Sequence, residues 1–233
     1  MSADARDAAL LATCPCVPVP RFGDLGEMPI GQRTLVGRDG VFAQVRRTWL
    51  DCVLRIADLP PVPPLPYGTV QERIAFSFGV IPLKLLERFI EAGRAALPNE
   101  VAGGLIYCAK ENTVRLEVYE SLRAGPGGVR YRMPSLAEHE AIAVDLHTHG
   151  RLRAFWSSTD DRDDQGVKVC GVFGNLHEKV PSAAFRLAVN GRFVALPHPW
   201  EERSSNDDPG LEDAKDRPTL NSIGFIGASE WSI

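Results

Sequence analysis

The chain has 233 residues and a mass of 25.5 kDa, which allows one substantial core, or a domain of about 130 residues beside a smaller unit. Its formal net charge is -4, and residues 201–217 alone hold seven acidic and three basic side chains, so the rest of the chain is close to neutral. The basic residues are scattered and do not form the cluster that is typical of a nucleic-acid-binding protein. We therefore expect no direct contact with nucleic acid.

The N-terminal stretch MSADARDAALLATCPCVPVP is not typical of a signal peptide. It has no basic n-region, and Asp4 and Asp7 precede an apolar segment that prolines interrupt. No apolar run in the chain approaches the roughly 20 residues that cross a bilayer. We therefore expect a cytoplasmic protein with no membrane segment. The five cysteines do not form a disulfide framework, and Cys14 and Cys16 lack a second pair of metal ligands nearby.

An N-terminal unit is predicted over residues 1–58. Its sequence TLVGRDGVFAQVRRTWLDCVLRI has a Gly-Arg-Asp-Gly turn followed by β-prone alternation, which indicates a small β-rich unit with a hairpin. Residues 59–70 include LPPVPPLPYG and are predicted to be a linker, because proline removes backbone donors and favours an extended chain. A P-x-x-P ligand for a partner domain is the alternative for this segment.

Residues 71–200 are predicted to form a mixed α/β domain. The stretch PLKLLERFIEAGRAAL has apolar residues at helical spacing and predicts a helix over 82–97, with proline in its first turn. The apolar run AIAVDLHTH predicts a central strand. A second helix is expected to begin at Ser157, where a serine cap precedes acidic residues. Further strands are predicted at VAGGLIYCAK, TVRLEVYES, VCGVFG, AFRLAVN and RFVAL.

The C-terminal residues 201–233 are predicted to be an acidic tether followed by an apolar tail. The tether has few apolar anchors and is expected to be flexible. The tail TLNSIGFIGASEWSI is too apolar for a solvated end, so we expect it to dock onto its own domain or onto a partner. Packing against the N-terminal unit is favoured over occupation of its own substrate cleft as an autoinhibitor.

Two of the five histidines, His147 and His149, stand at alternate positions of the predicted central strand, and Ser157 and Asp160 follow. Side chains at i and i+2 of a strand point the same way, so both imidazoles could face one metal ion. Each feature also has a simpler explanation, since paired histidines are often structural and S-x-x-D is a helix-capping pattern. The run DDRDD, which begins at Asp160, is explained most simply as a solvated helix face.

Together these residues form H-x-H, seven residues and S-x-x-D, which resembles the signature of the JAB/MPN zinc metallopeptidases, or JAMM family. The family also has a glutamate where its first helix meets its first strand, and Glu100 in LPNEVAGGLIY stands at that junction. AFWSSTDDRDD and AFRLAVNGRF look most like the bacterial branch. The resemblance implies a mixed, cytidine-deaminase-like sheet flanked by helices. The H-x-E and P-C-x-x-C signature of the zinc deaminases is absent.

The implied site binds Zn2+ through His147, His149 and Asp160 and leaves one position open for water. Metal coordination lowers the pKa of water to roughly 7 in favourable cases, which makes hydroxide available at neutral pH. Glu100 would accept the proton and return it to a leaving amine. Ser157 would donate a hydrogen bond to the oxyanion of a tetrahedral intermediate, or would serve only as a helix cap.

Several residues around the motif are candidates for binding the substrate or orienting the ligands. Arg151 and Arg153 could bind an acidic or C-terminal substrate, or could simply be solvated. Phe155 and Trp156 could line the substrate cleft or pack under the loop. Asp145 shares the alternation of the histidines and could accept a hydrogen bond from a ligand imidazole.

One departure from the family pattern is Gly150, which stands where many members have proline and allows a looser turn. The whole chain, with its N-terminal unit, is similar to the protein A family of PRTRC cassettes. The resemblance implies a zinc-dependent peptidase or isopeptidase that cleaves at the C-terminal tail of a ubiquitin-like protein, with ThiF- and E2-related cassette proteins as partners. The alternative is a non-catalytic interaction module that uses zinc for stability.

Overall fold

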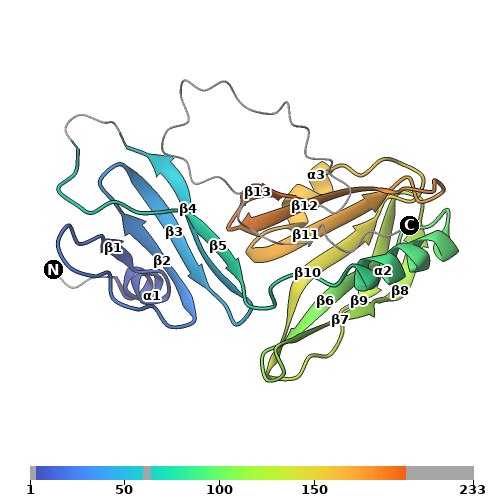
Figure 1. The fold of residues 1–233 in the computed structure, drawn as a ribbon, viewed down its shortest axis with the longest axis horizontal. Helices are drawn as coiled ribbons and strands as arrows, with labels where there is room; N and C mark the ends of the chain where they lie inside the picture. Colours follow the sequence, from blue (N-terminus) through green and yellow to red (C-terminus); the bar gives the residue numbers. More distant parts are fainter. Residues whose placement is uncertain (1–3, 60–63, 198–233) are drawn as a thin grey trace. The chain divides into compact units, whose positions relative to one another are not determined.

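The computed structural model describes residues 4–59 and 64–197 (Figure 1). The predicted tether and tail at residues 201–233 lie outside the described residues, as do residues 60–63 of the predicted linker. Within the described parts of the chain, every helix is too short or too polar to cross a membrane.

The chain is divided into two compact units, and the division falls between Ser77 and Phe78. This boundary lies later than the one we expected at residue 71. The reason is a strand that the sequence analysis did not predict, β5 (Arg73–Phe76), which pairs antiparallel with β4 (Leu50–Asp58). The end of the predicted linker region is therefore followed by one more strand of the N-terminal unit.

The N-terminal unit is built on a five-stranded sheet in the order β1-β2-β3-β4-β5. Its first three strands are β1 (Cys16–Pro18), β2 (Gly31–Val36) and β3 (Gly40–Arg46). β2 and β3 form the predicted hairpin, whose turn is closed by a hydrogen bond of 2.9 Å from the Gly37 amide to the Gly40 carbonyl. A buried cluster packs on this sheet and consists of Val19, Leu35, Phe42 and Val53. The expected β-rich unit is present.

Helix α1 (Ala5–Thr13) precedes this sheet and was not predicted. The Asp4 side chain accepts a hydrogen bond from the Arg6 amide at 2.9 Å, so it caps the helix. Asp7 lies in the first turn, where a negative charge complements the helix dipole. The acidic residues that argue against a signal peptide therefore also mark the start of a helix.

The second unit is built on a six-stranded mixed sheet in the order β13-β12-β11-β10-β6-β7. The predicted central strand, β10 (Glu140–Thr148), runs parallel to β11 (Val167–Gly174) and antiparallel to β6 (Ala102–Cys108). The outer strands are β7 (Thr113–Val118), β12 (Ser182–Val189) and β13 (Arg192–Leu196). Each strand predicted in this region is present, and the fold class is confirmed as mixed α/β.

Helix α2 (Leu83–Ala96) confirms the helix predicted over 82–97 and covers one face of this sheet. Phe89, fully buried, has its ring 5.7 Å from that of Phe173 on β11 and would touch any side chain at Gly103 on β6. The two strand residues lie on the same face as Leu146 of β10, which is 1% exposed. Alternation along β10 then directs Asp145 and His147 to the opposite face.

A separate two-stranded hairpin, β8 (Glu120–Gly125) with β9 (Gly128–Arg132), follows β7 and was not predicted as such. The run TVRLEVYES had suggested one strand, but the chain leaves the large sheet at Tyr119. The Tyr119 and Tyr131 rings lie 5.0 Å apart, so they connect the start of the hairpin with its second strand. The hairpin also reaches the segment between α2 and β6, because the Gly125 carbonyl accepts a hydrogen bond from the Glu100 amide at 3.0 Å.

Replacing Phe89 by alanine should lower the free energy of unfolding by about 3–5 kcal/mol, because the ring fills the contact between α2 and the sheet and little can close the cavity. Chemical denaturation of the purified variant measures this loss. Arg88→Ala is the matched control, since Arg88 is exposed on the same helix and alanine favours helix. Equal stability of the two variants would contradict the assigned packing of α2.

Candidate metal centre

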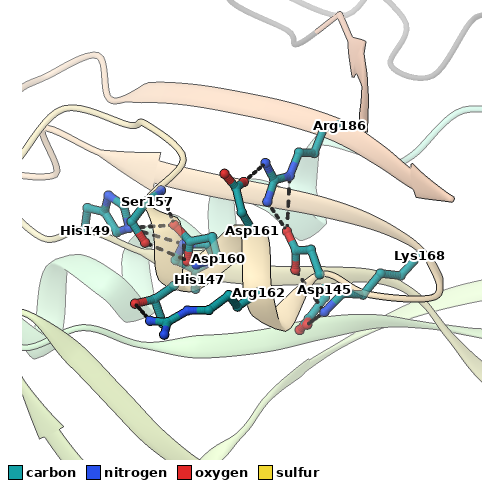
Figure 2. A network of polar contacts seen from close by, with 11 residues as sticks. Asp145, His147, His149, Ser157, Asp160, Asp161, Arg162, Lys168 and Arg186 are labelled. Atoms are coloured by element: carbon teal, nitrogen blue, oxygen red, sulfur yellow. Dashed lines mark hydrogen bonds and ion pairs between the residues drawn. The ribbon is translucent and has the colours of Figure 1, made fainter. Parts of the chain in front are cut away.

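His147, His149 and Asp160 bring their ligand atoms together (Figure 2). His147 lies one residue before the end of β10, and His149 follows the strand directly. Their Nε2 atoms are 3.2 Å apart. Asp160 places Oδ1 3.4 Å from His147 Nε2 and Oδ2 3.9 Å from His149 Nε2. Across residues 4–59 and 64–197, this is the only group of three such side chains that could hold a metal ion.

Asp160 is presented by a short helix, α3 (Ser158–Asp163), which begins where the sequence predicted. Ser157 is its N-cap, and the Ser157 Oγ accepts a hydrogen bond from the Asp160 amide at 3.2 Å. In return, Asp160 Oδ2 accepts one from the Ser157 amide at 2.6 Å. This capping box fixes the Asp160 carboxylate and leaves Oδ1 as the oxygen nearer to His147.

The spacing of the three donors fits a tetrahedral ion. Zinc binds histidine nitrogen and carboxylate oxygen at about 2.0–2.2 Å, so two ligands of a tetrahedral ion lie roughly 3.3 Å apart. The 3.2 Å between the two imidazole nitrogens and the 3.4 Å from His147 to Asp160 Oδ1 are close to that value, whereas His149 is nearest to the other carboxylate oxygen, at 3.9 Å. Three protein donors leave a fourth position open, which is the pattern of catalytic zinc sites, whereas structural sites are closed by four.

The histidines are in the protonation state that a metal requires. Burial lowers the pKa of His147 and of His149, and the nearby negative charge of Asp160 opposes this shift only in part. Both imidazoles are therefore neutral at pH 7, with a lone pair available for coordination. Acidification that protonates them would compete with metal binding.

Glu100 lies at the junction that the sequence predicted, between α2 and β6, and it is 8% exposed. Burial raises the pKa of its carboxyl group to about 7, and the charge of Asp160 adds to the shift. Two hydrogen bonds of 2.9 Å join Val101, the next residue, to Thr148 between the two histidines, so Glu100 lies close to the metal-binding group. A carboxyl group with a pKa near neutrality is suited to accept and return a proton at physiological pH.

The loop after His149 is tightly held, which corrects the expectation of a looser turn. Gly150 has a φ of +56°, a conformation that proline cannot adopt. Its carbonyl accepts a hydrogen bond from the Leu176 amide at 3.0 Å, and the His149 carbonyl accepts one from the Leu152 amide at 3.0 Å. The backbone geometry therefore explains why glycine stands here.

Gly174, at the end of β11, lets this loop lie directly on the sheet. A Cβ at Gly174 would collide with the backbone of Leu152, Arg153 and Ala154. The Ala154 amide also donates a hydrogen bond to Ser182 Oγ at 2.8 Å. The requirement for glycine at this position could not be predicted, because a glycine at a strand end is usually only a turn signal.

The aromatic residues between the ligands lie against the histidines. Phe155 has its ring 4.4 Å from that of His149 and is 47% exposed, so it offers an apolar surface beside the metal-binding group. Trp156 is half-buried, and its ring meets that of His147 at 6.1 Å, edge to face. Arg151 and Arg153 are exposed on the same loop. Phe155 thus remains a candidate to contact a substrate, whereas Trp156 packs within the domain.

Two of the predictions around the motif are corrected by ion pairs. Asp145 contacts Lys168 Nζ, 3.1 Å from its Oδ2, whereas we expected it to orient a ligand imidazole. The acidic run DDRDD is not simply a solvated face, since Asp164 is 7% exposed. Asp164 pairs with Lys168 at 3.0 Å and with Arg186 of β12 at 2.6 Å. Arg186 also pairs with Asp161 at 2.6 Å.

Lys168 and Arg186 were missed because their partners lie on other elements, β10 and α3, which come together only in the folded domain. The signal that could have found Arg186 is its position in the apolar run AFRLAVN, where an arginine inside a strand requires a partner. Asp145, Cys170 and Arg186 occupy neighbouring positions across β10, β11 and β12. This alignment places Arg186 on the face that carries His147.

Each unit is similar to a known domain family. Residues 82–188 match the prokaryotic homologs of the JAB domain. The match contains Glu100, both histidines, Ser157 and Asp160. Residues 4–77 match a domain family of unknown function, DUF2016, and these limits agree with the N-terminal unit. We refer to residues 82–188 as the JAB-like domain.

Comparisons with whole proteins add little to this result. No curated protein matches the chain. Among solved structures, the chain is similar to the solution structure of protein DSY2949 from Desulfitobacterium hafniense, with 16% identity and a TM-score of 0.33. That similarity covers 50% of this chain and 88% of the other. A score this low supports no conclusion about the JAB-like domain.

Gly174→Ala should displace the loop of the JAB-like domain that carries Phe155 and leads to Asp160, because the new methyl group meets backbone and not a flexible side chain. We expect a loss of about 1–3 kcal/mol in unfolding free energy and weaker metal binding, measured by denaturation and metal titration. In the control Gly127→Ala, the methyl group has no neighbour within 4 Å. A variant at Gly174 that behaves like this control would show that the loop does not need the glycine.

The raised pKa of Glu100 predicts a specific pH dependence in the metal-free JAB-like domain. Between about pH 4.5 and 7 the folded protein keeps a proton that the unfolded chain releases, so the unfolding free energy falls as pH rises. The contribution of one proton is at most about 1.4 kcal/mol per pH unit. Urea denaturation of the chelator-treated protein should show this fall, and Glu100→Gln should lack it. The same slope in both proteins would rule out Glu100 as its source.

Proposed function

We propose that this protein is a metal-dependent hydrolase of amide bonds, a zinc peptidase or isopeptidase of the JAMM type. The observation that carries the proposal is the group His147, His149 and Asp160, in which each side chain offers one donor atom and a tetrahedral ion would keep a fourth position open. The match of residues 82–188 to the prokaryotic JAB homologs supports it. Two nitrogens and one carboxylate oxygen are a donor set that suits zinc.

A zinc ion held there would act as a Lewis acid that makes water more acidic and polarises the substrate carbonyl. Glu100 would take the proton from water on its carboxylate and deliver it to the leaving nitrogen as the amide bond breaks. Its raised pKa, about 7, makes both transfers accessible near neutral pH. Glu100 would therefore act in catalysis without coordinating the metal.

Ser157 would serve as both helix cap and oxyanion donor, because the two roles use different parts of its hydroxyl group. In the capping box, Ser157 Oγ accepts a hydrogen bond from the Asp160 amide. A hydroxyl group has one hydrogen to donate in addition to its acceptor lone pairs. That hydrogen is free to stabilise the negative oxygen of a tetrahedral intermediate.

The substrate we propose is the C-terminal tail of a ubiquitin-like protein or its conjugate. Support comes from the similarity of the sequence to the PRTRC protein A family, whose cassettes also encode ThiF- and E2-related proteins. Arg151 and Arg153 are exposed beside the site and could pair with acidic groups of such a partner. Phe155, exposed next to His149, would contact an apolar side chain near the scissile bond.

Metal analysis and directed variants test the proposal. The purified protein should bind about one zinc ion per chain, and removal of the ion should abolish hydrolysis of a ubiquitin-like fusion. His149→Ala should lose both metal and activity, because it removes a ligand. Glu100→Gln should keep the metal and the fold and lose a factor of roughly 10² to 10⁴ in rate, since only the proton transfer is removed.

The same measurements separate an enzyme from a non-catalytic module stabilised by zinc. A module would bind the ion and lose stability on chelation, yet would cleave neither the fusion nor the ubiquitin-like protein of its own cassette. Absence of metal uptake on titration would contradict both roles. A Glu100→Gln variant with the wild-type rate on the authentic substrate would contradict the assignment of Glu100.

A further inference from the structure

We infer that Arg186 is a positioning residue for the metal site. It contacts neither Asp160 nor His147 directly and acts on them through neighbouring residues. The inference rests on the proposed function, since it concerns the geometry of the same ligands. Arg186 comes from β12, is 4% exposed, and approaches α3 from the sheet (Figure 2).

Helix α3 needs an anchor of this kind. It has six residues, and none of them is buried. A helix this short is marginal in water, and most helical stability in proteins comes from packing of an apolar face, which the sequence STDDRD does not have. Beyond its capping box, the position of α3 therefore depends on polar contacts with the sheet.

Arg186 supplies those contacts at two points. Its Nη1 pairs with Asp161 Oδ1 at 2.6 Å, and its Nε and Nη2 donate to Asp164 Oδ2 at 3.1 and 2.6 Å. Asp161 directly follows Asp160, so the guanidinium group binds the helix beside the metal ligand and, through Asp164, at the C-terminal end of the helix. The planar donor fork of arginine suits such a bridge between two carboxylates.

The same guanidinium group also fixes Trp156, which directly precedes the N-cap Ser157 of the helix. It lies over the Trp156 ring at 4.0 Å and the Phe193 ring at 3.9 Å, stacked against both. The Trp156 ring meets the ring of His147 edge to face. One side chain thus constrains Asp160 through α3 and His147 through Trp156.

Lys168 extends the anchor to the central strand. It bridges Asp164, at 3.0 Å, and Asp145, at 3.1 Å, and Asp145 lies two residues before His147 on β10. Ion pairs therefore connect the helix that carries one ligand with the strand that carries another. Partners that bond directly to metal ligands typically contribute about tenfold to a hundredfold in metal affinity, and Arg186 and Lys168 act one contact further from the ion.

Arg186→Lys tests the inference, because lysine keeps the charge but has no planar fork to bridge both carboxylates and stack on Trp156. We expect about tenfold weaker zinc binding, the lower end of the range for direct partners, measured by competition with a chromophoric chelator. The visible spectrum of the cobalt-substituted protein should also change, since it reports the ligand geometry. Arg162→Lys is the matched control, because in the described part of the chain Arg162 hydrogen-bonds within its own helix, to Ser158 and Thr159, and it should leave both readouts unchanged.

A double-variant cycle distinguishes positioning from general destabilisation. If Arg186 acts largely through Asp160, then Arg186→Lys should cost much less zinc affinity in an Asp160→Asn background than in the wild-type protein. Two results would overturn the inference. One is an equal loss of zinc affinity from Arg186→Lys in the wild-type protein and in the Asp160→Asn variant, and the other is wild-type zinc affinity of Arg186→Lys alone. If Arg186→Lys fails to fold, Asp161→Asn, which removes one exposed partner, should weaken binding in the same direction, and unchanged affinity there would overturn it. A wild-type protein that binds no zinc contradicts the proposed function itself.

Discussion

The alternation of side chains along β10 is the constraint on which the site depends. One strand at the centre of the sheet must bury Leu146 beneath α2 and, on its opposite face, present His147. Since the period of a strand is two residues, the apolar packing on one face fixes the orientation of the polar residues on the other. The metal-binding geometry is therefore a consequence of the core, and a one-residue change of register would destroy both together.

On the face of the sheet that carries His147, ion pairs and not apolar packing hold the neighbouring helix α3. The helix that carries Asp160 has no buried side chain, and ion pairs with Arg186 and Lys168 hold it against the sheet. Buried ion pairs recover little net stability, because each charge has lost its hydration. Here these ion pairs fix orientation, since a guanidinium group donates good hydrogen bonds only to carboxylates in a narrow range of positions. Such pairs suit a helix that must be placed precisely beside two histidines.

Glycines allow the elements around the site to approach closely. Gly103 gives room to the ring of Phe89, and Gly93 on α2 lies against Thr148 and Leu176. Gly174 gives room to the backbone of the loop between His149 and Asp160. Close packing on both faces leaves little freedom for the loop and strand that carry the donors. The rigid part of the domain thus extends to the metal ligands.

The sequence by itself determined the features that are local. Helical spacing over 82–97, the apolar central strand, the serine cap and the spacing of H-x-H to S-x-x-D are all readable because periodicity and capping act within a few residues. Their resemblance to the JAMM signature also located Glu100. Only the tertiary structure decided that β5 belongs to the N-terminal sheet, that Gly174 must be glycine, and that Arg186 and Lys168 hold α3. Arg186 and Asp164 are 22 positions apart, and their pairing follows from the register of strands that meet only when the sheet forms.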